Sequence, residues 1–402
     1  MDDAPLTCDV LIVGGGPAGL SVASTLPDAV DTIIVHQDEE IGYPIRTSGG
    51  CWTDDTARLG IPPEMYNVLN TNEAFADDAH AVIPLKGNMP AILDTPRLYK
   101  WLARQSDHKT RRLMLATKFT GARVRGDGRY VCTIRTRDGS KREILARYLV
   151  EASGWHLAVL RALGLATARP GRLGVGTEYE YPLGANPPDR GIIFMGAKVP
   201  SGYGWAFGTA LGTLRIGVGV IQPDTDASPR KLLDAVVADE ALLARYGLKL
   251  EGEPVVHSGI LPSVAFDERM VWGNVVRVGD SANFATPTAG EGIRVCIDLG
   301  RELGKQLGRA VKTGRAGPLR AYERRARRQL KRSYKWGFIV NTRIARYGPK
   351  EWNASVRRMA KLDTASVTGL LRNDFSRRKI MALALSGGRA WVKSRLGRLT
   401  RR

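Results

Sequence analysis

Three glycines near the start of the chain have a spacing that suits phosphate binding. Gly14, Gly16 and Gly19 form a G-x-G-x-x-G pattern between an apolar run at 10–13 and a helical pattern that begins at Pro17. In this arrangement the first glycine permits a tight turn, the second lets the backbone approach a pyrophosphate, and the third lets the helix pack on the strand. Free backbone N–H groups and the helix dipole then hold the phosphates. The pattern predicts a dinucleotide site, and a purely structural glycine turn is the alternative.

A second group of such residues lies late in the chain. A strand expected at 275–278 leads into Asp280, and Gly290 and Gly292 precede a helix expected at 293–311. A carboxylate at this place accepts hydrogen bonds from a sugar-like polyol. The start of the helix offers free N–H groups to an anion or to an electron-rich ring edge. Their occurrence together indicates a second part of a ligand site.

The residues after the second expected strand, 32–35, depart from the usual dinucleotide pattern. A carboxylate normally ends this strand and holds the ribose hydroxyls. His36 stands there instead, and Asp38 and Glu39 follow it. Any of these three side chains is therefore a candidate for the ribose.

Two arginines have positions that favour contact with a ligand. Arg46 lies in a Gly- and Pro-rich loop at 41–52 and is followed by small residues, which suits a backbone lying against a flat ring. Arg97 stands in the first turn of a helix expected at 94–104, where the helix dipole disfavours a cation unless an anion lies nearby. A surface loop and a solvated arginine are the respective alternatives.

The middle of the chain predicts a second sheet. Stretches 173–222 and 254–266 are rich in strand patterns and are separated by a helical insert. Tyr203 and Trp205 alternate along one of these strands and so face the same side. That side is either core or the wall of a ligand site.

Charge is distributed very unevenly. Of the 60 Lys and Arg residues, 29 lie in 301–402 with only five Asp and Glu, and the whole chain carries a net charge of +20. A basic segment attached to a nearly neutral body favours an anionic surface as partner. In 376–402, Trp and Leu residues alternate with basic ones as in an interfacial amphipathic helix, so we expect a membrane surface rather than nucleic acid.

Cysteine usage and hydropathy indicate the cellular compartment of the protein. The four cysteines have no metal-binding spacing, which predicts a reducing compartment and no metal. The first strand begins too early for a signal peptide, and no apolar run of ~18 residues is present. We therefore expect a cytoplasmic protein, peripheral on the inner face of the membrane.

The separated motifs together resemble the FAD-binding arrangement of para-hydroxybenzoate hydroxylase-type flavoproteins. The match is carried by residues 8–22, Arg97 and 274–300. By this resemblance the glycine loop holds the pyrophosphate, Arg97 contacts the phosphate–ribose part and Asp280 binds the ribityl or phosphate segment. Ala152-Ser153-Gly154 stands where that class normally has Asp-Gly.

Within that class the chain is similar to the geranylgeranyl reductase family. Tyr203, Trp205 and Phe207 match its aromatic substrate motif, with Gly208 in place of a proline. The loop from Arg46 to Gly50 resembles the family's flavin-side loop. Some members have a cysteine where this chain has Ser48, and Cys51 lies close by.

The resemblance implies an α/β fold in which a Rossmann-type FAD-binding domain carries a smaller antiparallel-sheet substrate domain and a basic helical C-terminal tail. The expected divisions are 1–75, 94–165 and 268–315 for the FAD-binding domain, 76–93 and 166–267 for the substrate domain, and 316–402 for the tail. The implied cofactor-binding residues are Gly14, Gly16, Ala18, Gly19, Arg46, Ser48, Gly49, Arg97, Val124, Asp280, Gly290, Gly292 and Ile293. Tyr203, Trp205 and Phe207 are the implied substrate-binding residues, and Tyr203 and Cys51 are the candidate catalytic residues.

The implied activity is the reduction of prenyl-chain double bonds by FAD, which NAD(P)H or ferredoxin reduces. The substrate is a hydrophobic small molecule or a prenyl lipid. The same cofactor architecture also supports a monooxygenase that hydroxylates or epoxidises a small molecule, or a flavin-dependent cyclase, because fold alone does not decide chemistry. A membrane or nucleic-acid binder with a vestigial flavin site is the non-enzymatic alternative.

Overall fold

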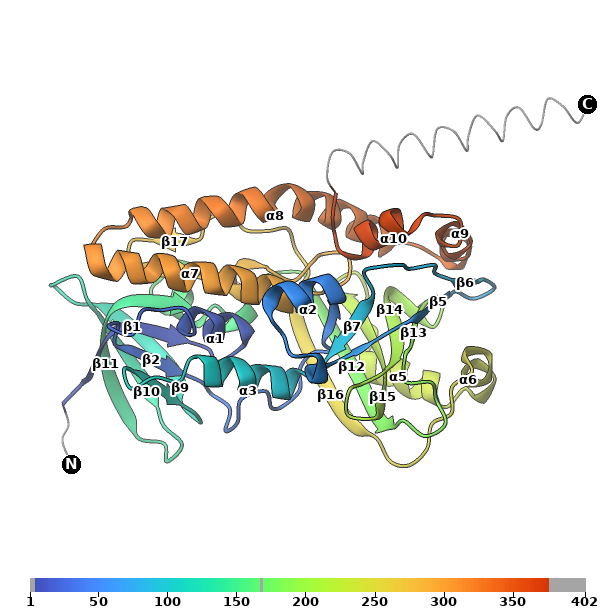
Figure 1. The fold of residues 1–402 in the computed structure, drawn as a ribbon, viewed down its shortest axis with the longest axis horizontal. Helices are drawn as coiled ribbons and strands as arrows, with labels where there is room; N and C mark the ends of the chain where they lie inside the picture. Colours follow the sequence, from blue (N-terminus) through green and yellow to red (C-terminus); the bar gives the residue numbers. More distant parts are fainter. Residues whose placement is uncertain (1–3, 167–168, 376–402) are drawn as a thin grey trace, which may run out of the picture.

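The computed structural model of the protein describes residues 4–166 and 169–375, and Figure 1 shows their arrangement. An eight-stranded sheet occupies one end of the elongated molecule and a seven-stranded sheet the other. Two long helices, α7 (Ile293–Thr313) and α8 (Gly317–Ile344), lie side by side along one flank. The segment 376–402, for which an amphipathic helix is predicted, lies outside the described residues.

The eight-stranded sheet has a parallel core in the order β18-β11-β1-β2-β8. Its strands are β1 (Leu6–Val13), β2 (Thr32–Val35), β8 (Arg111–Met114), β9 (Lys118–Val124), β10 (Tyr130–Arg135), β11 (Lys141–Glu151), β17 (Val271–Trp272) and β18 (Val275–Arg277). Val10, Leu11 and Ile12 have no exposed surface, as expected for a parallel strand covered on both faces. Strands β9 and β10 extend β11 as an antiparallel meander. This arrangement confirms the predicted α/β class.

Helices cover both faces of this sheet. They are α1 (Pro17–Ala23), α3 (Thr95–Gln105), α4 (Ala158–Ala162) and α7. Gly300, Gly304 and Gly308 form one stripe of α7, and a Cβ on each would lie 2.8 Å or closer to atoms of residues 18–27. Only glycine therefore allows α7 to approach α1 this closely.

The seven-stranded sheet has the order β16-β12-β15-β14-β13-β5-β6. Its strands are β5 (Thr71–Phe75), β6 (His80–Val82), β12 (Leu173–Pro182), β13 (Arg190–Gly196), β14 (Val199–Gly208), β15 (Thr213–Gln222) and β16 (Val255–Pro262). Phe194, Ile216 and Val218 on one face pack under α5 (Pro229–Val237) and α6 (Glu240–Tyr246). The other face carries Trp205, which packs against a cluster formed by Leu69, Ile92 and Phe207.

A small sheet joins the two units. It consists of β3 (Gly50–Trp52), β7 (Pro90–Leu93) and β4 (Tyr66–Val68), and α2 (Thr53–Leu59) follows β3. Leu93 and Cys51 share a core with residues of α3 and α7, so this small sheet packs on the domain of the eight-stranded sheet.

The expected domain boundary at residue 75 differs from the structure. β5 pairs in parallel with β13 and so belongs to the second sheet, whereas β7 lies in the small sheet and not in the substrate domain. Pairing of a short strand with a partner more than 100 residues away depends on the whole fold, and local patterns do not specify it.

The C-terminal region is helical as predicted, in the part that the structure describes. Tyr322, Leu330 and Tyr334 of α8 are buried in the main core beside α7. The two following helices, α9 (Pro349–Met359) and α10 (Thr364–Leu371), pack beside β5, β6 and β13. No helix within 4–375 as described is long and apolar enough to cross a bilayer, and these residues hold no cluster of potential metal ligands.

Candidate flavin site

The glycine loop follows β1 at the carboxyl end of the parallel sheet. Gly14 has a φ of +120°, and a Cβ there would lie 2.1 Å from the carbonyl oxygen of Ala152. A Cβ on Gly19 would lie 2.1 Å from the carbonyl oxygen of Gly14, so Gly19 sets the contact between helix and strand. A Cβ on Gly16 would meet no protein atom within 4 Å. The first and third glycines are thus required by the protein itself, and the second faces open space.

The structure brings Asp280 to this loop. β18 ends beside β11, and a Cβ on Gly279 would lie 2.8 Å from the Cβ of Ala18. The 3₁₀ turn at Gly279–Ala282 also contacts the 3₁₀ turn at Gly154–His156. The second turn begins at the last residue of Ala152-Ser153-Gly154, the segment that replaces the usual Asp-Gly motif. Segments that are more than 250 residues apart in sequence therefore form one wall.

Asp280 has an unusual electrostatic environment. Burial raises the pKa of its carboxyl to about 6, although a hydrogen bond from the backbone of Ala285 acts in the opposite direction. The ion pairs of the described residues include none with Asp280. A carboxylate without a cation beside a glycine loop is suited to accept hydrogen bonds from hydroxyl groups.

Among the three ribose candidates, His36 contacts the glycine loop. The backbone N–H of Gly15 donates to its Nδ1 at 3.2 Å. Burial lowers the pKa of His36, and the charge of Asp38 partly opposes this shift. Asp38 is occupied by Arg46, whose guanidinium donates to both carboxylate oxygens at 2.7 and 3.0 Å. Glu39 is exposed and pairs with Arg137.

Two loops of the chain face the second sheet. Gly49 has a φ of +83° and packs against the backbone of Leu93. The backbone of Arg46 lies against β16, since a Cβ on Gly259 would be 1.9 Å from the Arg46 carbonyl oxygen. The loop at 286–292 closes with hydrogen bonds from Thr286 to Glu291 and from Gly290 to Thr286. Ser48 is half-buried in the first loop, and Gly292 and the buried Ile293 begin α7 after the second.

The structure gives Arg97 two partners within the protein. Its Nη1 donates to the carbonyl oxygen of Glu64 at 3.1 Å, and its Nε lies 3.7 Å from Asp94. These contacts satisfy the cation at the start of α3 without an external anion. A phosphate contact by Arg97 remains a prediction.

Val124 lies away from the glycine loop. Val124 of β9 pairs with Tyr130 of β10, and Tyr130 pairs in turn with Ala146 of β11. On the next strand, Ala146 pairs with Cys8, which lies near the beginning of β1. The glycine loop follows the other end of that strand. Val124 is 63% exposed, so the structure does not bring it to the other candidate residues.

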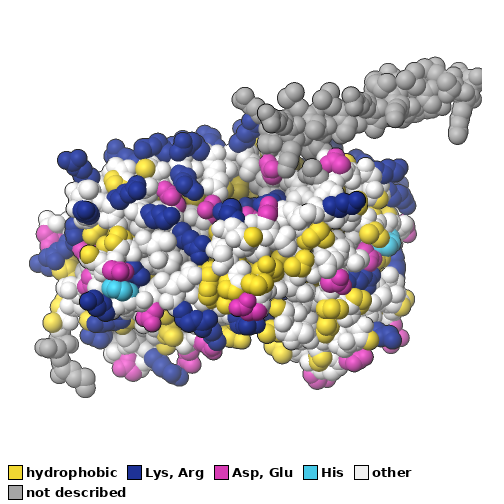
Figure 2. All heavy atoms as spheres, in the orientation of Figure 1, with side chains coloured by type: hydrophobic (Ala, Val, Ile, Leu, Met, Phe, Trp, Pro, Cys, Tyr) yellow, Lys and Arg dark blue, Asp and Glu magenta, His cyan; other side chains and the backbone are white. Residues whose placement is uncertain are grey.

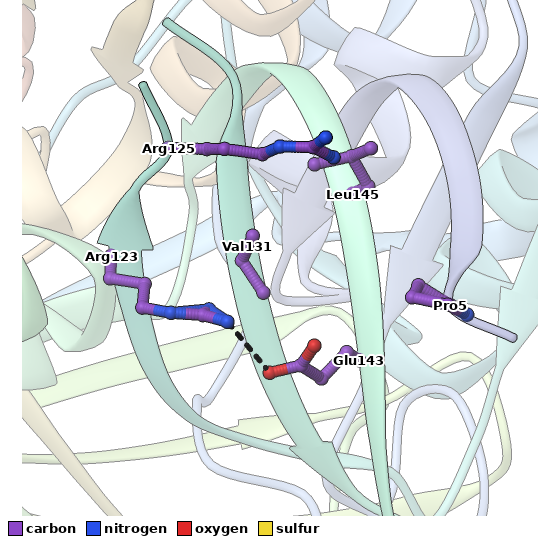
Figure 3. A pocket seen from close by; sticks show the side chains of 6 residues that line it. All are labelled: Pro5, Arg123, Arg125, Val131, Glu143 and Leu145. Carbon is purple, nitrogen blue, oxygen red and sulfur yellow. Dashed lines mark ion pairs between the residues drawn. The ribbon is translucent and has the colours of Figure 1, made fainter. Parts of the chain in front are cut away.

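The hollow beside Val124 is a separate feature. Figure 3 shows its lining residues on β9, β10 and β11, with the ion pair of Arg123 and Glu143 at 3.4 Å. Its volume is about 300 Å³, and Pro5 places it at the start of β1. It contains none of the predicted site residues.

Of the two candidate catalytic residues, Cys51 is buried and Tyr203 is half-buried. Burial raises the pKa of the Cys51 thiol, and the charge of Glu291 adds to the effect, so the thiolate is disfavoured. Burial also raises the pKa of Tyr203 to about 12. Its hydroxyl donates to the carbonyl oxygen of Ala289 at 2.7 Å. Tyr203 therefore connects β14 to the loop at 286–292.

We expect Tyr203→Phe to leave the shape of the pH–rate profile unchanged and to lower the free energy of unfolding by about 1 kcal/mol, because it removes one partly buried hydrogen bond. Denaturant unfolding and rates across pH measure the two effects. Loss of one limb of the pH profile with unchanged stability would instead assign proton transfer to this hydroxyl.

Several glycines of the second sheet lie directly beneath the ring of Trp205. Tyr203, Gly219, Gly176 and Gly259 occupy one row across four strands. A Cβ on Gly217 would lie 2.5 Å from the Trp205 ring, so the ring rests flat on the sheet. Phe207, two residues further, packs against Leu69 and Ile92.

A buried charged group on the same face was not predicted from the sequence. Trp205 Nε1 donates to Glu178 at 3.0 Å, and Arg215 Nε and His257 Nε2 lie 2.9 and 2.8 Å from Glu180. Burial alone would raise the pKa of Glu180, but His257 and Arg215 lower it to about 2. The available signal was the alternation of Glu178 and Glu180 with tyrosines along β12, together with the single Arg215 in the otherwise uncharged β15.

These features fit FAD. Gly16 leaves a cradle that any Cβ would begin to fill, and Asp280 offers an unpaired carboxylate for hydroxyl groups. Residues 7–336 match the family described as FAD binding domain. When bound, FAD supplies hydride transfer, and the protein supplies binding, orientation and electrostatics.

The relatives agree with this assignment. The chain is 27% identical over 323 residues to digeranylgeranylglycerophospholipid reductase 3 of Methanosphaera stadtmanae, which covers 76% of this chain and 78% of that protein. The fold of this chain is similar to that of a geranylgeranyl bacteriochlorophyll reductase-like protein of Thermoplasma acidophilum, with a TM-score of 0.80 and 18% identity. The match covers 95% of this chain and 99% of the Thermoplasma chain. The fold is also similar to that of a probable FAD-dependent monooxygenase of Pseudomonas aeruginosa, with a TM-score of 0.63, 16% identity and coverage of 88% and 100%.

The resemblance to geranylgeranyl reductases that the motifs indicate is thereby confirmed. The family match spans most of the sequence, from the first strand into α8. The chain belongs to the FAD binding domain family and is an FAD-dependent oxidoreductase.

Proposed function

We propose that the enzyme reduces carbon–carbon double bonds of a prenyl chain of the geranylgeranyl type. The observation that carries this proposal is the aromatic face of β14, which Tyr203 links directly to the loop before α7. An apolar wall beside the flavin loops suits a substrate made of hydrocarbon. The name of the Methanosphaera relative supports the same substrate class.

The roles of the side chains follow from their contacts. Trp205, held by Glu178 and resting on Gly217, offers a flat apolar surface with a fixed orientation. The hydrogen bond from Tyr203 to Ala289 holds β14 against the loop at 286–292. This contact positions the substrate side relative to the cofactor side. The bond between Arg46 and Asp38 fixes the loop that passes over β16.

Product mass after turnover without oxygen tests the proposal. We expect the purified protein, reduced with dithionite and incubated with prenyl lipids, to add two hydrogens per double bond. Product that contains added oxygen and forms only in air would identify a monooxygenase, for which the Pseudomonas neighbour is a precedent in fold. A rearranged product of unchanged mass would identify a cyclase.

The same assay decides the physiological reductant. We propose NAD(P)H or ferredoxin as the source of electrons. Replacing dithionite with each in turn, and following the bleaching of the bound flavin, identifies which one the enzyme accepts. We also place the enzyme on the inner face of the membrane, where a prenyl lipid resides.

A further inference from the structure

The outward face of α8 carries a row of exposed residues, most of which are cations. Positions 320, 324, 328, 332, 335, 339 and 343 follow one another in steps of three or four residues, so they lie on the same side of the helix. All of them are exposed, and every one except Ile339 is Lys or Arg. At 1.5 Å per residue the row is about 35 Å long. Figure 2 shows dark blue side chains along this edge of the molecule, where Figure 1 places α8.

These cations are not neutralised by the protein. Neighbouring Arg325, Arg327 and Lys331 form ion pairs with Glu302 or Glu268. In the described part of the chain, no acidic partner is found for the row members Arg320, Arg324, Arg328, Arg332, Lys335 and Arg343. The acidic residue nearest to the row in sequence, Glu323, points inward and accepts from the backbone N–H of Met270. A row of unpaired cations without an anion among them is complementary to a negatively charged surface.

Two apolar side chains identify the kind of surface. Trp336 is 41% exposed and Ile339 is 44% exposed, and they lie between the cations of the row. Trp and aliphatic side chains flanked by Lys and Arg are typical of helices that lie in the headgroup region of a bilayer. Contacts with nucleic acid phosphates would use the cations alone and would leave Ile339 without a role.

The inner side of the same helix closes the flavin and substrate regions. Gly337 packs against Asn373, which is 3.4 Å from Thr288 in the loop before α7. Asn341 accepts from Arg172, the residue before β12, and the carbonyl of Ala345 accepts from Ser201 of β14. A single helix therefore has the site on one side and the cationic row on the other.

We propose that α8 docks the enzyme on an anionic lipid bilayer, with Trp336 and Ile339 entering the headgroup layer. This assignment places the membrane contact on the folded body of the enzyme, in addition to the basic segment that follows it. It does not depend on which bond the enzyme reduces, since binding is measured without turnover.

Sedimentation of the full chain with vesicles tests the charge row. We compare vesicles of phosphatidylcholine containing phosphatidylglycerol with vesicles of phosphatidylcholine alone. The triple variant R324Q/R328Q/R332Q is expected to bind the anionic vesicles about 100-fold more weakly, at about 1 kcal/mol per charge. The matched variant R112Q/K141Q/R142Q removes the same charge from exposed positions on the first domain and is expected to bind like the wild type. Equal losses in both variants would overturn the proposal.

A second pair of variants separates a bilayer from nucleic acid. W336A/I339A keeps every charge and is expected to lose at least about tenfold in vesicle affinity, whereas V82A/L211A, at two other exposed apolar positions, retains it. If W336A/I339A binds vesicles as well as the wild type, and single-stranded RNA competes for the same arginines, the row is a nucleic-acid site and the proposal is wrong. Failure of the reductase assay with intact vesicle binding would overturn only the proposed function.

Discussion

Gly16→Ala is expected to remove flavin binding while leaving the folded protein intact. Gly16 has an extended backbone with φ −82°, and an added Cβ would meet no protein atom within 4 Å. The unfolding free energy of the flavin-free protein should therefore change by less than about 0.5 kcal/mol. FAD affinity should fall roughly 10- to 100-fold, because the methyl group occupies the space that the pyrophosphate approaches. Flavin absorbance after reconstitution and chemical unfolding measure the two quantities.

Two further glycines provide the controls. Gly14→Ala forces a side chain into φ +120° and to within 2.1 Å of a backbone oxygen, so it should destabilise the protein by about 3 kcal/mol. Gly121→Ala on β9 meets no atom within 4 Å, and it should affect neither quantity. If Gly16→Ala binds FAD as tightly as Gly121→Ala does, the loop is a structural turn and the flavin assignment of this wall is wrong.

Asp280→Asn is expected to stabilise the flavin-free protein and to weaken FAD binding. The pKa of Asp280 is about 6 in the folded state and 3.8 in its ordinary state. Between these values the folded state holds a proton that the unfolded state has released, so stability falls as pH rises through this window and stays lower above it. An amide avoids that loss, and partial solvent contact limits the gain to about 1–2 kcal/mol near pH 7.

The loss of affinity has a different cause. A carboxylate accepts stronger hydrogen bonds from hydroxyl groups than an amide oxygen does, and the substitution should weaken FAD binding by about 10- to 100-fold. Unfolding at about pH 4 and about pH 7 tests the stability term, because the gain should vanish at the lower pH. The exposed Asp127, whose pKa is lowered chiefly by Arg129, provides a control, and Asp127→Asn should leave FAD affinity unchanged. A variant that gains no stability at neutral pH would show that Asp280 is already satisfied without the cofactor.

The parts of the site that could be predicted are those encoded by local spacing. The three glycines of the first loop, the Asp280 segment and the alternation of Tyr203 with Trp205 each depend on one strand and its turn. Their partners could not be predicted, because they lie on other elements. Arg46 pairs with Asp38 and Arg97 contacts Glu64, so both arginines have protein partners that the sequence does not reveal.

Register accounts for the remaining differences. Val124 was placed at the cofactor by resemblance, but the register across β9, β10, β11 and β1 sets it level with Cys8, five residues before the end of β1 that leads into the glycine loop. The group around Glu178 and Arg215 arises only when β12 and β15 pair with both residues on one face. A change of one residue in that pairing would turn each side chain to the other face.

The glycine stripe of α7 has a consequence for synthesis on the ribosome. The backbone of α1 receives its tightest cover from Gly300, Gly304 and Gly308, which are translated long after residues 17–27. Domains usually fold as units as they emerge, beginning from the amino end. Here α1 keeps one face uncovered until about three-quarters of the polypeptide has left the exit tunnel, so the nucleotide-binding half cannot complete its core before then.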